Sequence, residues 1–555
     1  MLPGSGGGDY TSDGDFGPGG GVVRIEATNV TINGTLTADG GTGGTYDGGG
    51  AGGSIWISCA SFGGGTSGVV RARGGTGGYG YVTDTSGGGG RIAIIYSSLI
   101  GTPGAQFSVA PGSNYTYPAE YGTLYLPDTA LVTQPFNNFQ GVRLVIPGFN
   151  SLNADSLVVS NSIVSFGDGD FILTVTNNLT IWSNSWLALG GVMYGGTQAL
   201  KSVTVTATNP IVRVGGNVLL DRGGLTLGGA NQLSHVFMTV GTNLSITGGG
   251  ILKLGGNLQT AFSALTVGGN LVVTNNGQLH VYCGISNAVK RYGGRVAVSG
   301  STSIAGGGWI FPYSHQTNGA AVLFDLKDLL VGTSSGFNAD NNGFAWIGAT
   351  CYAPSYGATY GSRGAGSGHG GAGGSITLAA GGRPYGSTNA PLLPGAPGGY
   401  GYGNPSGFAQ PGGGVVQIHA GNITLNGQVK ASQTLANSYG GGGGGGGIFI
   451  TCDTFNGAST GVLRADGGNG GTSGNPQGGG GGGRISLAIG FSDTNIEKLI
   501  LGQPVAGLAE VPSHGTYLGI FSVTNGVGNG TGNPGTLGTV RILKIRYPGT
   551  LIDLR

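Results

Sequence analysis

The sequence predicts an all-β protein, a right-handed parallel β-helix (β-solenoid) with glycine-rich inserts. Three observations predict this fold class: a passage that occurs twice, short apolar-alternating segments that begin after asparagine, and glycine tracts that stand directly before such segments. Self-similarity at a long period is typical of repeat architectures, in which each coil buries its inward side chains only against its neighbours.

The repeated passage covers residues 18–95 and returns as residues 411–488 without a gap. The offset is constant, as for Val22 and Val415, which differ by 393. We therefore expect the chain to begin inside one repeat, to cross a full period and to stop early in the next, as an excerpt of a longer tandem protein would.

Composition separates this interpretation from its alternatives. Glycine supplies 127 of the 555 residues, charged residues 8% and apolar residues 38%. A disordered chain would hold few aliphatic and aromatic residues, and collagen would need glycine at every third position, so both are disfavoured. The net charge of +1 leaves no basic surface for nucleic acid. No apolar stretch approaches the length of about 18 residues that spans a bilayer.

The expected strands of the middle region each start after an asparagine, which tolerates the tight backbone of a turn. The residues that follow alternate, which places two aliphatic side chains on one face. These segments are Asn178–Ile181, Asn217–Leu220, Asn243–Ile246 and Asn270–Val273, with related copies at Asn29–Ile32 and Asn422–Leu425. Intervals of 26 and 27 residues separate the last three of the middle region, about one coil of a parallel β-helix. Inward asparagines are expected to stack into hydrogen-bonded ladders.

The glycine tracts are positional, because each stands directly before an expected strand. They are Gly52 and Gly53, Gly87 to Gly90, Gly373 and Gly374, Gly440 to Gly447, and Gly478 to Gly483. Ordering a run of glycines costs more conformational entropy than ordering any other sequence, so an ordered tract must be held by contacts. Two alternatives stay open: bundled polyglycine-II-like segments joined by amide bonds and Cα–H contacts, or flexible surface loops.

Glycine density divides the chain into four stretches. Residues 1–96 are interpreted as the C-terminal part of a Gly-rich repeat module, 97–336 as a β-solenoid spacer, 337–492 as a complete Gly-rich module and 493–555 as the start of the next spacer. The spacer supplies most of the apolar side chains, so we expect it to be the more stable part.

The order of motifs within the complete module resembles a known family. The series is Asn338–Asp340, Gly361–Gly364, Gly368–Gly371, Pro384–Ser387, Gly412–Gly414, Leu425–Gly427, the strand at Ile448, and Gly483–Ile485. This series resembles the Gly-rich tandem-repeat β-solenoid surface proteins of environmental bacteria, which are very long and secreted, over about half of the chain. The spacer is similar only generically to the passenger solenoids of autotransporter adhesins. The resemblance implies an extracellular, β-helical, repetitive protein and brings with it no reaction, ligand or functional residue.

Hydrolase chemistry has little support. Ser334 stands in a Gly-x-Ser-x-Gly match to a nucleophile elbow, but chance matches are expected in this composition and no α/β context surrounds it. The acidic pair Asp168 and Asp170 is interpreted as a solvated turn in preference to a Ca²⁺ site, and Asp13 with Asp15 carries the same ambiguity. A glycosidase would need two carboxyls about 5–10 Å apart in a cleft.

Histidine, arginine and cysteine are read mainly as structural. The histidines, which show no close metal-ligand spacing, are His235, His280, His315, His369, His419 and His514. His369 is expected to bond to backbone in a Gly-rich turn, and Arg91, Arg295 and Arg484 to bind carbonyls of neighbouring coils at strand starts. Cys59 and Cys452, one position in two copies, are interpreted as buried thiols. A bridge between Cys283 and Cys351 rests on parity alone.

The sequence offers candidates for two kinds of ligand-binding surface. The candidates for an aromatic sugar platform are Trp182, Trp186, Tyr79, Tyr81, Tyr400 and Tyr402. For the Gly-flanked tyrosines, covering bare glycine backbone is the favoured interpretation. An ice-binding surface would need a flat outward threonine array, which Thr31, Thr35 and Thr37 begin and no sustained ladder continues.

The sequence predicts no enzyme, catalytic residue, cofactor or metal. The leading function is a structural unit of a large extracellular or cell-surface repeat protein, forming a rod or head-to-tail filament with an adhesive role. The expected partners are copies of itself or adjacent repeats, end to end, and cell-surface polysaccharide, with no nucleic acid and no membrane-spanning segment. The alternatives are a carbohydrate-active β-helix enzyme, a lyase or glycosidase, and a carbohydrate- or ice-binding module.

Overall fold

The computed structural model describes most of the chain. The described residues are 1–9, 14–78, 85–113, 119–166, 170–182, 184–190, 209–228, 235–255, 262–286, 291–361, 363–400, 409–435, 439–472, 475–512 and 516–546. They belong to two compact units, Met1–Phe237 with Gly250–Asn257, and Met238–Gly249 with Leu258–Arg555. The division falls inside the segment 97–336.

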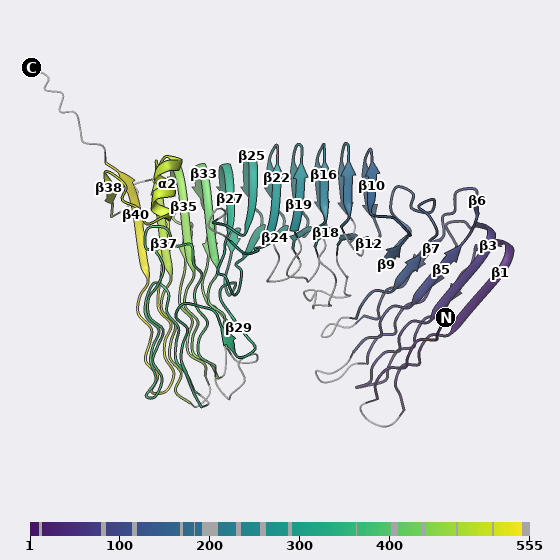
Figure 1. Ribbon diagram of the computed structural model, residues 1–555, viewed down its shortest axis with the longest axis horizontal. Coiled ribbons are helices and arrows are strands. Elements are labelled where there is room, and N and C mark those ends of the chain that lie inside the picture. The colour runs from purple at the N-terminus through teal and green to yellow at the C-terminus, as the bar shows by residue number, and fades with distance from the viewer. Residues whose placement is uncertain are drawn as a thin grey trace, which may run out of the picture. The chain divides into compact units, whose positions relative to one another are not determined.

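The first unit is built of parallel strands stacked rung on rung (Figure 1). One sheet runs in the order β1 (Val22–Thr31), β3 (Ser54–Gly63), β5 (Arg91–Ile95), β8 (Thr123–Tyr125), β9 (Gln140–Val145), β12 (Ile163–Phe166), β15 (Trp186–Leu189), β18 (Gly224–Leu227) and β21 (Ile251–Leu254), with β6 (Ser98–Ile100) beside β3. A small sheet is formed by β2 (Thr35–Thr37), β4 (Val69–Arg71) and β7 (Gln106–Ser108). Two further ladders are β10 (Ser151–Ala154) with β13 (Ile172–Val175) and β16 (Ile211–Val214), and β11 (Leu157–Ser160) with β14 (Leu179–Trp182) and β17 (Val218–Asp221).

The second unit follows the same plan. One sheet contains β20 (Leu244–Thr247), β22 (Phe262–Val267), β23 (Leu271–Val273), β25 (Gly294–Ile304), β27 (Val322–Val331), β33 (Val415–Leu425), β35 (Gly447–Asn456), β37 (Arg484–Ile489), β40 (Thr539–Ile545) and β38 (Leu508–Glu510). The other runs β24 (Gln278–Tyr282), β26 (Trp309–Tyr313), β28 (Gly336–Asn338), β34 (Gln428–Lys430), β36 (Val462–Arg464) and β39 (Ile520–Ser522). β19 (His235–Val240) spans the division, and two hairpins are formed by β29 (Trp346–Ile347) with β30 (Thr350–Cys351) and β31 (Thr359–Tyr360) with β32 (Arg363–Gly364).

Inward side chains form continuous apolar rows along each stack. In the second unit Ile418 of β33 lies opposite Ile450 of β35, which lies opposite Leu487 of β37, and all three are almost completely buried. In a parallel ladder each apolar side chain lies beside an apolar side chain of the next rung, so neighbouring coils bury one another's inward faces. The predicted parallel β-solenoid is therefore confirmed.

The asparagine ladders form, but on the outside, which corrects the expectation of inward stacking. Asn178 accepts the backbone N–H of Asn217 on its Oδ1 at 2.9 Å in the first unit. In the second unit Asn243 does the same for Asn270 at 2.9 Å. These residues are exposed because they stand at the corner before the strand, where an amide side chain can supply the carbonyl that the turn lacks.

The two copies of the repeated passage fold alike down to single hydrogen bonds. Three backbone bonds of the first copy recur 393 residues later: Ser54 N to Gly21 O and Gly447 N to Gly414 O, both 3.0 Å; Arg91 N to Gly53 O and Arg484 N to Gly446 O, both 2.9 Å; Gly90 N to Ala72 O at 2.8 Å and Gly483 N to Ala465 O at 2.7 Å. Similar sequence has therefore produced the same backbone arrangement twice.

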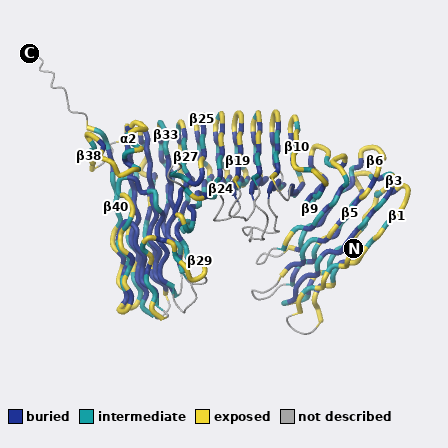
Figure 2. The backbone as a smooth tube through the Cα atoms, viewed as in Figure 1, coloured by how far each residue is buried: buried dark blue, intermediate teal, exposed yellow. Residues whose placement is uncertain are grey.

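The glycine tracts of the second unit are layered extended segments, which continue the rungs below β33, β35 and β37 (Figure 1). Gly445 donates to Gly481 at 2.9 Å, and Gly442 to Gly478 at 2.8 Å, so the tracts 440–447 and 478–483 are bonded side by side. Figure 2 shows much of this layer as buried. A Cβ on Gly446 would lie 2.7 Å from the oxygen of Gly413, so the spacing admits no side chain.

Helix α2 (Asp493–Ile500) covers part of the outer face of β35 and β37 in the second unit (Figure 1). It forms because Ile496, Leu499 and Ile500 recur at helical spacing, with Asp493 in the first turn and Lys498 in the last. Leu499 packs in a cluster with buried apolar residues of the neighbouring strands. Among the described residues, no helix is both long and apolar enough to cross a membrane.

Candidate functional site

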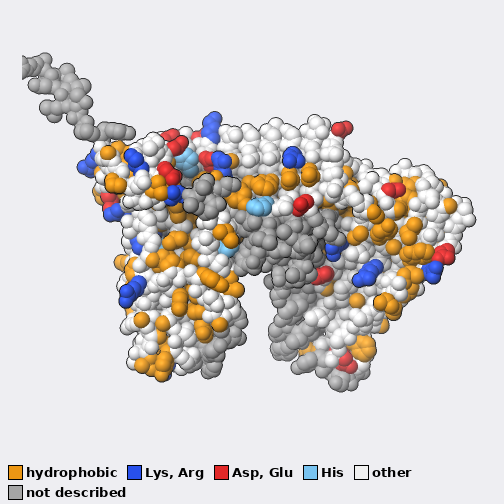
Figure 3. All heavy atoms as spheres, viewed as in Figure 1, with side chains coloured by type: hydrophobic (Ala, Val, Ile, Leu, Met, Phe, Trp, Pro, Cys, Tyr) orange, Lys and Arg blue, Asp and Glu red, His pale blue; other side chains and the backbone are white. Residues whose placement is uncertain are grey.

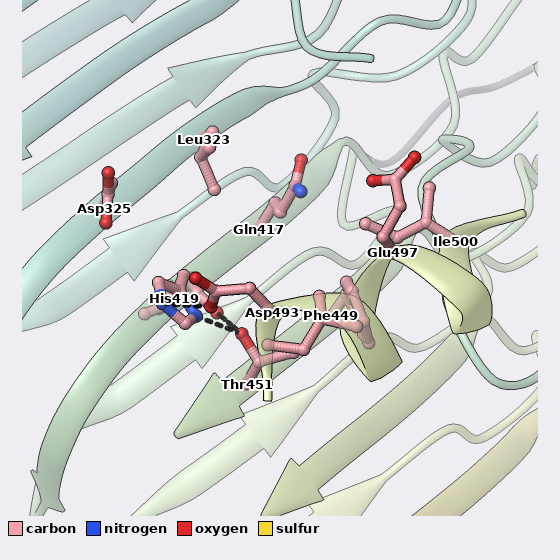
Figure 4. Close-up of a pocket in the computed structure, with 11 residues that line it drawn as sticks. Leu323, Asp325, Gln417, His419, Phe449, Thr451, Asp493, Glu497 and Ile500 are labelled. Atoms are coloured by element: carbon pink, nitrogen blue, oxygen red, sulfur yellow. Dashed lines mark hydrogen bonds and ion pairs between the residues drawn. The ribbon is translucent and has the colours of Figure 1, made fainter. Parts of the chain in front are cut away.

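A pocket of about 260 Å³ lies beside α2 in the second unit (Figure 4). Its floor consists of two outward rows that cross three strands: Leu323, Gln417 and Phe449 form one row, and Asp325, His419 and Thr451 the other. Its wall is the helix face that carries Asp493, Ile496, Glu497 and Ile500. Parallel pairing in register therefore brings segments distant in sequence to one place.

His419 links the floor to the helix. Its Nδ1 shares a hydrogen bond of 2.8 Å with Oγ1 of Thr451, and its Nε2 lies 3.9 Å from Oδ1 of Asp493. The Asp493 side chain is 96% exposed, so its attraction to a protonated His419 is screened by water. Thr451 is buried, and its hydroxyl is held by His419, an arrangement that orients the imidazole.

The other two carboxylates of the pocket have cationic partners. Asp325 pairs with Arg295, and Glu497 lies 3.4 Å from Arg291. Figure 3 shows acidic, basic and histidine side chains gathered in this part of the second unit, near α2 and β33. The pocket thus has carboxylates at its rim with part of their charge balanced by arginine.

Gln417 supplies an unsatisfied group. The residue is 6% exposed, and its Oε1 has no hydrogen-bond partner among the described residues. In Figure 4 its side chain rises from β33 between Leu323 and Glu497. A buried amide oxygen without a donor costs about 1–3 kcal/mol, so a ligand that donates to it would recover that free energy.

The first copy of the passage carries different side chains at the corresponding positions. Arg24 stands where the second copy has Gln417, and Trp56 stands where it has Phe449. The guanidinium of Arg24 lies 5.0 Å from the ring centroid of Trp56 and bonds to Glu26, which corresponds to His419. The pocket residues are therefore specific to the second copy.

His369 is completely buried in the glycine layer of the second unit. Its Nδ1 lies 2.8 Å from the oxygen of Gly445, while Nε2 has no partner among the described residues. Desolvation, and to a lesser extent the charge of Arg484, lower its pKa to about 4, so the neutral form is held at neutral pH. His369 bonds to backbone as predicted, and Tyr385 packs against its ring.

The residues considered for catalysis or metal binding are not brought together. Ser334 lies in an exposed turn with φ of 60°, and the strand β28 follows it where a nucleophile elbow would have a helix. Asp170 accepts two bonds from Asn209, at 2.7 and 3.0 Å, while Asp168 and Asp13 lie outside the described residues. Asp15 is exposed. No group of three or more histidine, cysteine or acidic side chains within the described ranges is arranged to hold a metal ion.

The remaining histidines occupy unrelated positions. His235 stacks on Phe237, and His280 stacks on Phe311 at 4.6 Å between centroids. His315 is buried, and its Nδ1 accepts the N–H of Asn318 at 3.0 Å; burial lowers its pKa. His514 lies outside the described residues.

The arginines at strand starts differ from one another. Arg484 donates from Nε to the carbonyl of Tyr385 at 2.9 Å, as predicted. Arg91 is exposed, and Arg295 pairs with Asp325, a carboxylate, where a carbonyl was expected. The difference arises because only Arg484 is covered by a neighbouring segment of the module.

The described members of the candidate sugar platform, Trp182, Trp186 and Tyr400, are not brought together. Trp186 donates to Thr226 at 3.0 Å in the first unit, and Trp182 is a separate exposed side chain. Tyr400 meets Trp346 edge to face at 4.9 Å, and Trp346 donates to the carbonyl of Gly398 at 2.9 Å, so this pair covers glycine backbone. Tyr79, Tyr81 and Tyr402 lie outside the described residues.

A second aromatic group, unforeseen from the sequence, lies on the outer face of β24 and β26. Tyr282 and Tyr313 stack at 4.1 Å with an interplanar angle of 4°. Rings stacked between rungs cover each other's faces, and a sugar needs an open face, so we assign this group a structural role. The exposed Thr31, Thr35 and Thr37 likewise stay a short series on β1 and β2.

All four cysteines are free thiols. Cys59, Cys283 and Cys452 are buried, and Cys351 is half-buried. Burial raises the pKa of Cys452 to about 12 and that of Cys351 to about 11, which disfavours the reactive thiolate. The predicted burial of Cys59 and Cys452 is confirmed, and Cys283 and Cys351 form no bridge.

Sequence reasoning missed the pocket because it missed α2. Residues 493–555 are predicted as the start of a spacer, although the segment has three helix signals: Ser492 as N-cap, Asp493 in the first turn and the spacing of Ile496 and Ile500.

Comparison with protein-family models, curated proteins and solved structures found no match for this chain.

Proposed function

We propose that this chain is a structural unit of a large extracellular or cell-surface repeat protein, in which rungs continue from one repeat into the next and copies join end to end. The observation that carries the proposal is a difference between two corresponding strands, β1 in the first copy and β33 in the second, in their place within the sheet. β33 is a central strand of its sheet, paired with β27 and β35, whereas β1 stands at the edge of its sheet.

The edge of β1 has the features of an unfilled position. Val415 on β33 is fully buried, while Val22 on β1 is 43% exposed. The N–H of Gly414 donates to Ala339 at 2.8 Å, whereas no described atom lies within 4 Å of a Cβ built on Gly21. A free strand edge from a second copy or an adjacent repeat would give β1 a partner on the side where β33 has β27.

The last strands of the second unit indicate where a partner would bind. β38 pairs antiparallel with Leu543–Ile545 and so occupies the C-terminal half of the outer edge of β40. Among the described residues β39 pairs only with β36, and Leu518 and Ile520 are exposed there. A partner at this end is therefore expected to extend β39.

The location and the adhesive role rest on the composition and on the resemblance described above. Charged residues make up only 8% of the chain, and the packed glycine layers leave few charged side chains on the visible face of the lower part of the second unit (Figure 3). Such a surface suits contact with neutral polymers and with further repeats.

Electron microscopy and sedimentation of the purified chain test the proposal. We expect particles that associate end to end as concentration rises, with an axial repeat of one subunit. Val22→Lys places a charge on the open edge and should weaken association, while Ile285→Lys, at a residue 59% exposed on the second unit, should leave it unchanged. Isolated particles at all concentrations, or equal association of both variants, would contradict the proposal.

A further inference from the structure

We propose that the pocket beside α2 binds a single saccharide residue of neutral or amino type. This inference does not depend on end-to-end assembly. It rests on the size of the pocket, on the hydrogen-bonding groups and apolar surface that line it, and on the replacement of those groups in the first copy of the passage.

The size limits the ligand to about one small ring. The pocket measures about 260 Å³, and sites for drug-sized molecules generally occupy about 300–1,000 Å³. A longer polymer could still bind if one residue entered and the rest followed the surface.

The polar groups call for a ligand that donates hydrogen bonds. Oε1 of Gln417 is buried without a donor, and the exposed carboxylate of Asp493 accepts only. His419 adds an imidazole whose Nε2 faces Asp493 at 3.9 Å. Hydroxyl and amino groups are the donors that satisfy such acceptors, and a ring that carries several of them matches the number of acceptors present.

The apolar groups call for a ligand with a C–H face. Leu323 and Phe449 lie in one row with Gln417, and Ile496 and Ile500 face them from the helix. Saccharides combine a hydroxyl rim with an apolar ring face, which matches a pocket lined by both polar and apolar side chains.

The charges select against acidic sugars. Asp325, Asp493 and Glu497 all line the pocket, and arginine partners offset only Asp325 and Glu497. The remaining negative charge at Asp493 therefore disfavours an anionic ligand and attracts an amino sugar, an effect that water weakens because this side chain is exposed.

The first copy shows which side chains can replace those of the site. Arg24 and Trp56 stand where the second copy has Gln417 and Phe449, and the guanidinium lies over the indole. The next residue along the strand points inward and is the same in both copies, Ile25 after Arg24 and Ile418 after Gln417. The first copy thus supplies a set of replacement side chains that the same strand backbone carries.

Saturation-transfer NMR with the full chain tests the proposal. The probes are the methyl glycosides of glucose, galactose and mannose, together with glucosamine, glucuronate and butylammonium. We expect transfer to at least one neutral or amino sugar and none to glucuronate. The triple variant Gln417→Arg, His419→Glu, Phe449→Trp should abolish transfer while leaving the circular dichroism spectrum unchanged.

Two further variants separate the site from general effects. Gln417→Leu removes only the unsatisfied acceptor and should weaken affinity about threefold to tenfold. The matched control Arg24→Gln, Glu26→His, Trp56→Phe makes the reverse exchange in the first copy, where no α2 is present, and should bind sugar as the parent chain does. Transfer to no sugar, transfer to glucuronate or butylammonium alone, or undiminished binding by the triple variant would overturn the proposal.

Discussion

Gly446 lies where two glycine-rich segments of the second unit are too close for a side chain. Its N–H donates to the carbonyl of Ala431 at 2.6 Å, and the next residue, Gly447, donates to Gly414 at 3.0 Å. A Cβ at this position would lie 2.7 Å from the oxygen of Gly413 and closer still to that of Gly414. Replacement by alanine must therefore displace backbone, because no flexible side chain is available to give way.

The expected cost of Gly446→Ala follows from two effects. Overpacking costs about 1–3 kcal/mol, and breaking a buried backbone hydrogen bond costs about another 1–3 kcal/mol. The smaller conformational entropy of unfolded alanine opposes these by about 0.4–1 kcal/mol. We expect a net loss of about 3 kcal/mol in the free energy of local opening.

Hydrogen exchange measured by mass spectrometry reads this loss locally and needs no two-state unfolding. Peptides that cover the tract 440–447 should exchange roughly 100-fold faster in Gly446→Ala, since each 1.4 kcal/mol is about tenfold. Gly34→Ala is the control, because a Cβ there meets no described atom within 4 Å. If exchange of the tract is the same in both variants, the glycines do not hold a close-packed layer and the reasoning is refuted.

Three further changes probe other parts of the second unit. Burial lowers the pKa of His369 to about 4, from about 6.5 in the unfolded chain. The free energy of unfolding should therefore be highest above about pH 6.5 and fall by on the order of 3 kcal/mol as the pH is lowered towards 4. Urea unfolding of His369→Gln should not show this pH dependence. Tyr313→Ala removes one ring of a closely stacked pair and should cost about 2–3 kcal/mol, whereas Tyr360→Ala, at an exposed ring, should cost little; equal urea midpoints would exclude a stabilising stack. In a thiol titration of the folded chain, Cys351 should react before Cys283, which should react only on unfolding, and a disulfide-linked peptide joining them would contradict the free thiols.

The fold was predictable from the sequence because its signals are local. Alternation after Asn178 and Asn243 places β14 and β20 where the structure has them, and a parallel stack follows from repeating such units. The side on which the asparagines lie was not predictable, since the same spacing fits an inward residue and a corner residue. Only the three-dimensional path of the coil distinguishes the two.

The pocket could not be predicted, because its residues come from four separated segments. Leu323, Gln417 and Phe449 meet only through the register of three parallel strands, and a one-residue slip would turn each of them to the other face. The helix that forms the wall had readable signals, but nothing in the sequence states which strand it covers. The unsatisfied oxygen of Gln417 is likewise a property of packing and has no sequence signature.

The two copies keep the apolar character of their inward positions while they differ in chemistry at this pocket. Inward residues stay apolar along the paired strands, as with Ile57 and Ile450 or Ile94 and Leu487, because each must fit the rung on either side. The glycines directly before the strands are also retained, as with Gly53 and Gly446, since a Cβ at either position would push neighbouring backbones apart. The outward row differs more between the copies: Arg24 and Trp56 stand where the second copy has Gln417 and Phe449, and Phe449 is itself buried beneath α2. A repeat built in this way keeps one backbone while each copy can present a different site, which makes the outward rows beside α2 the place where function can diverge between repeats.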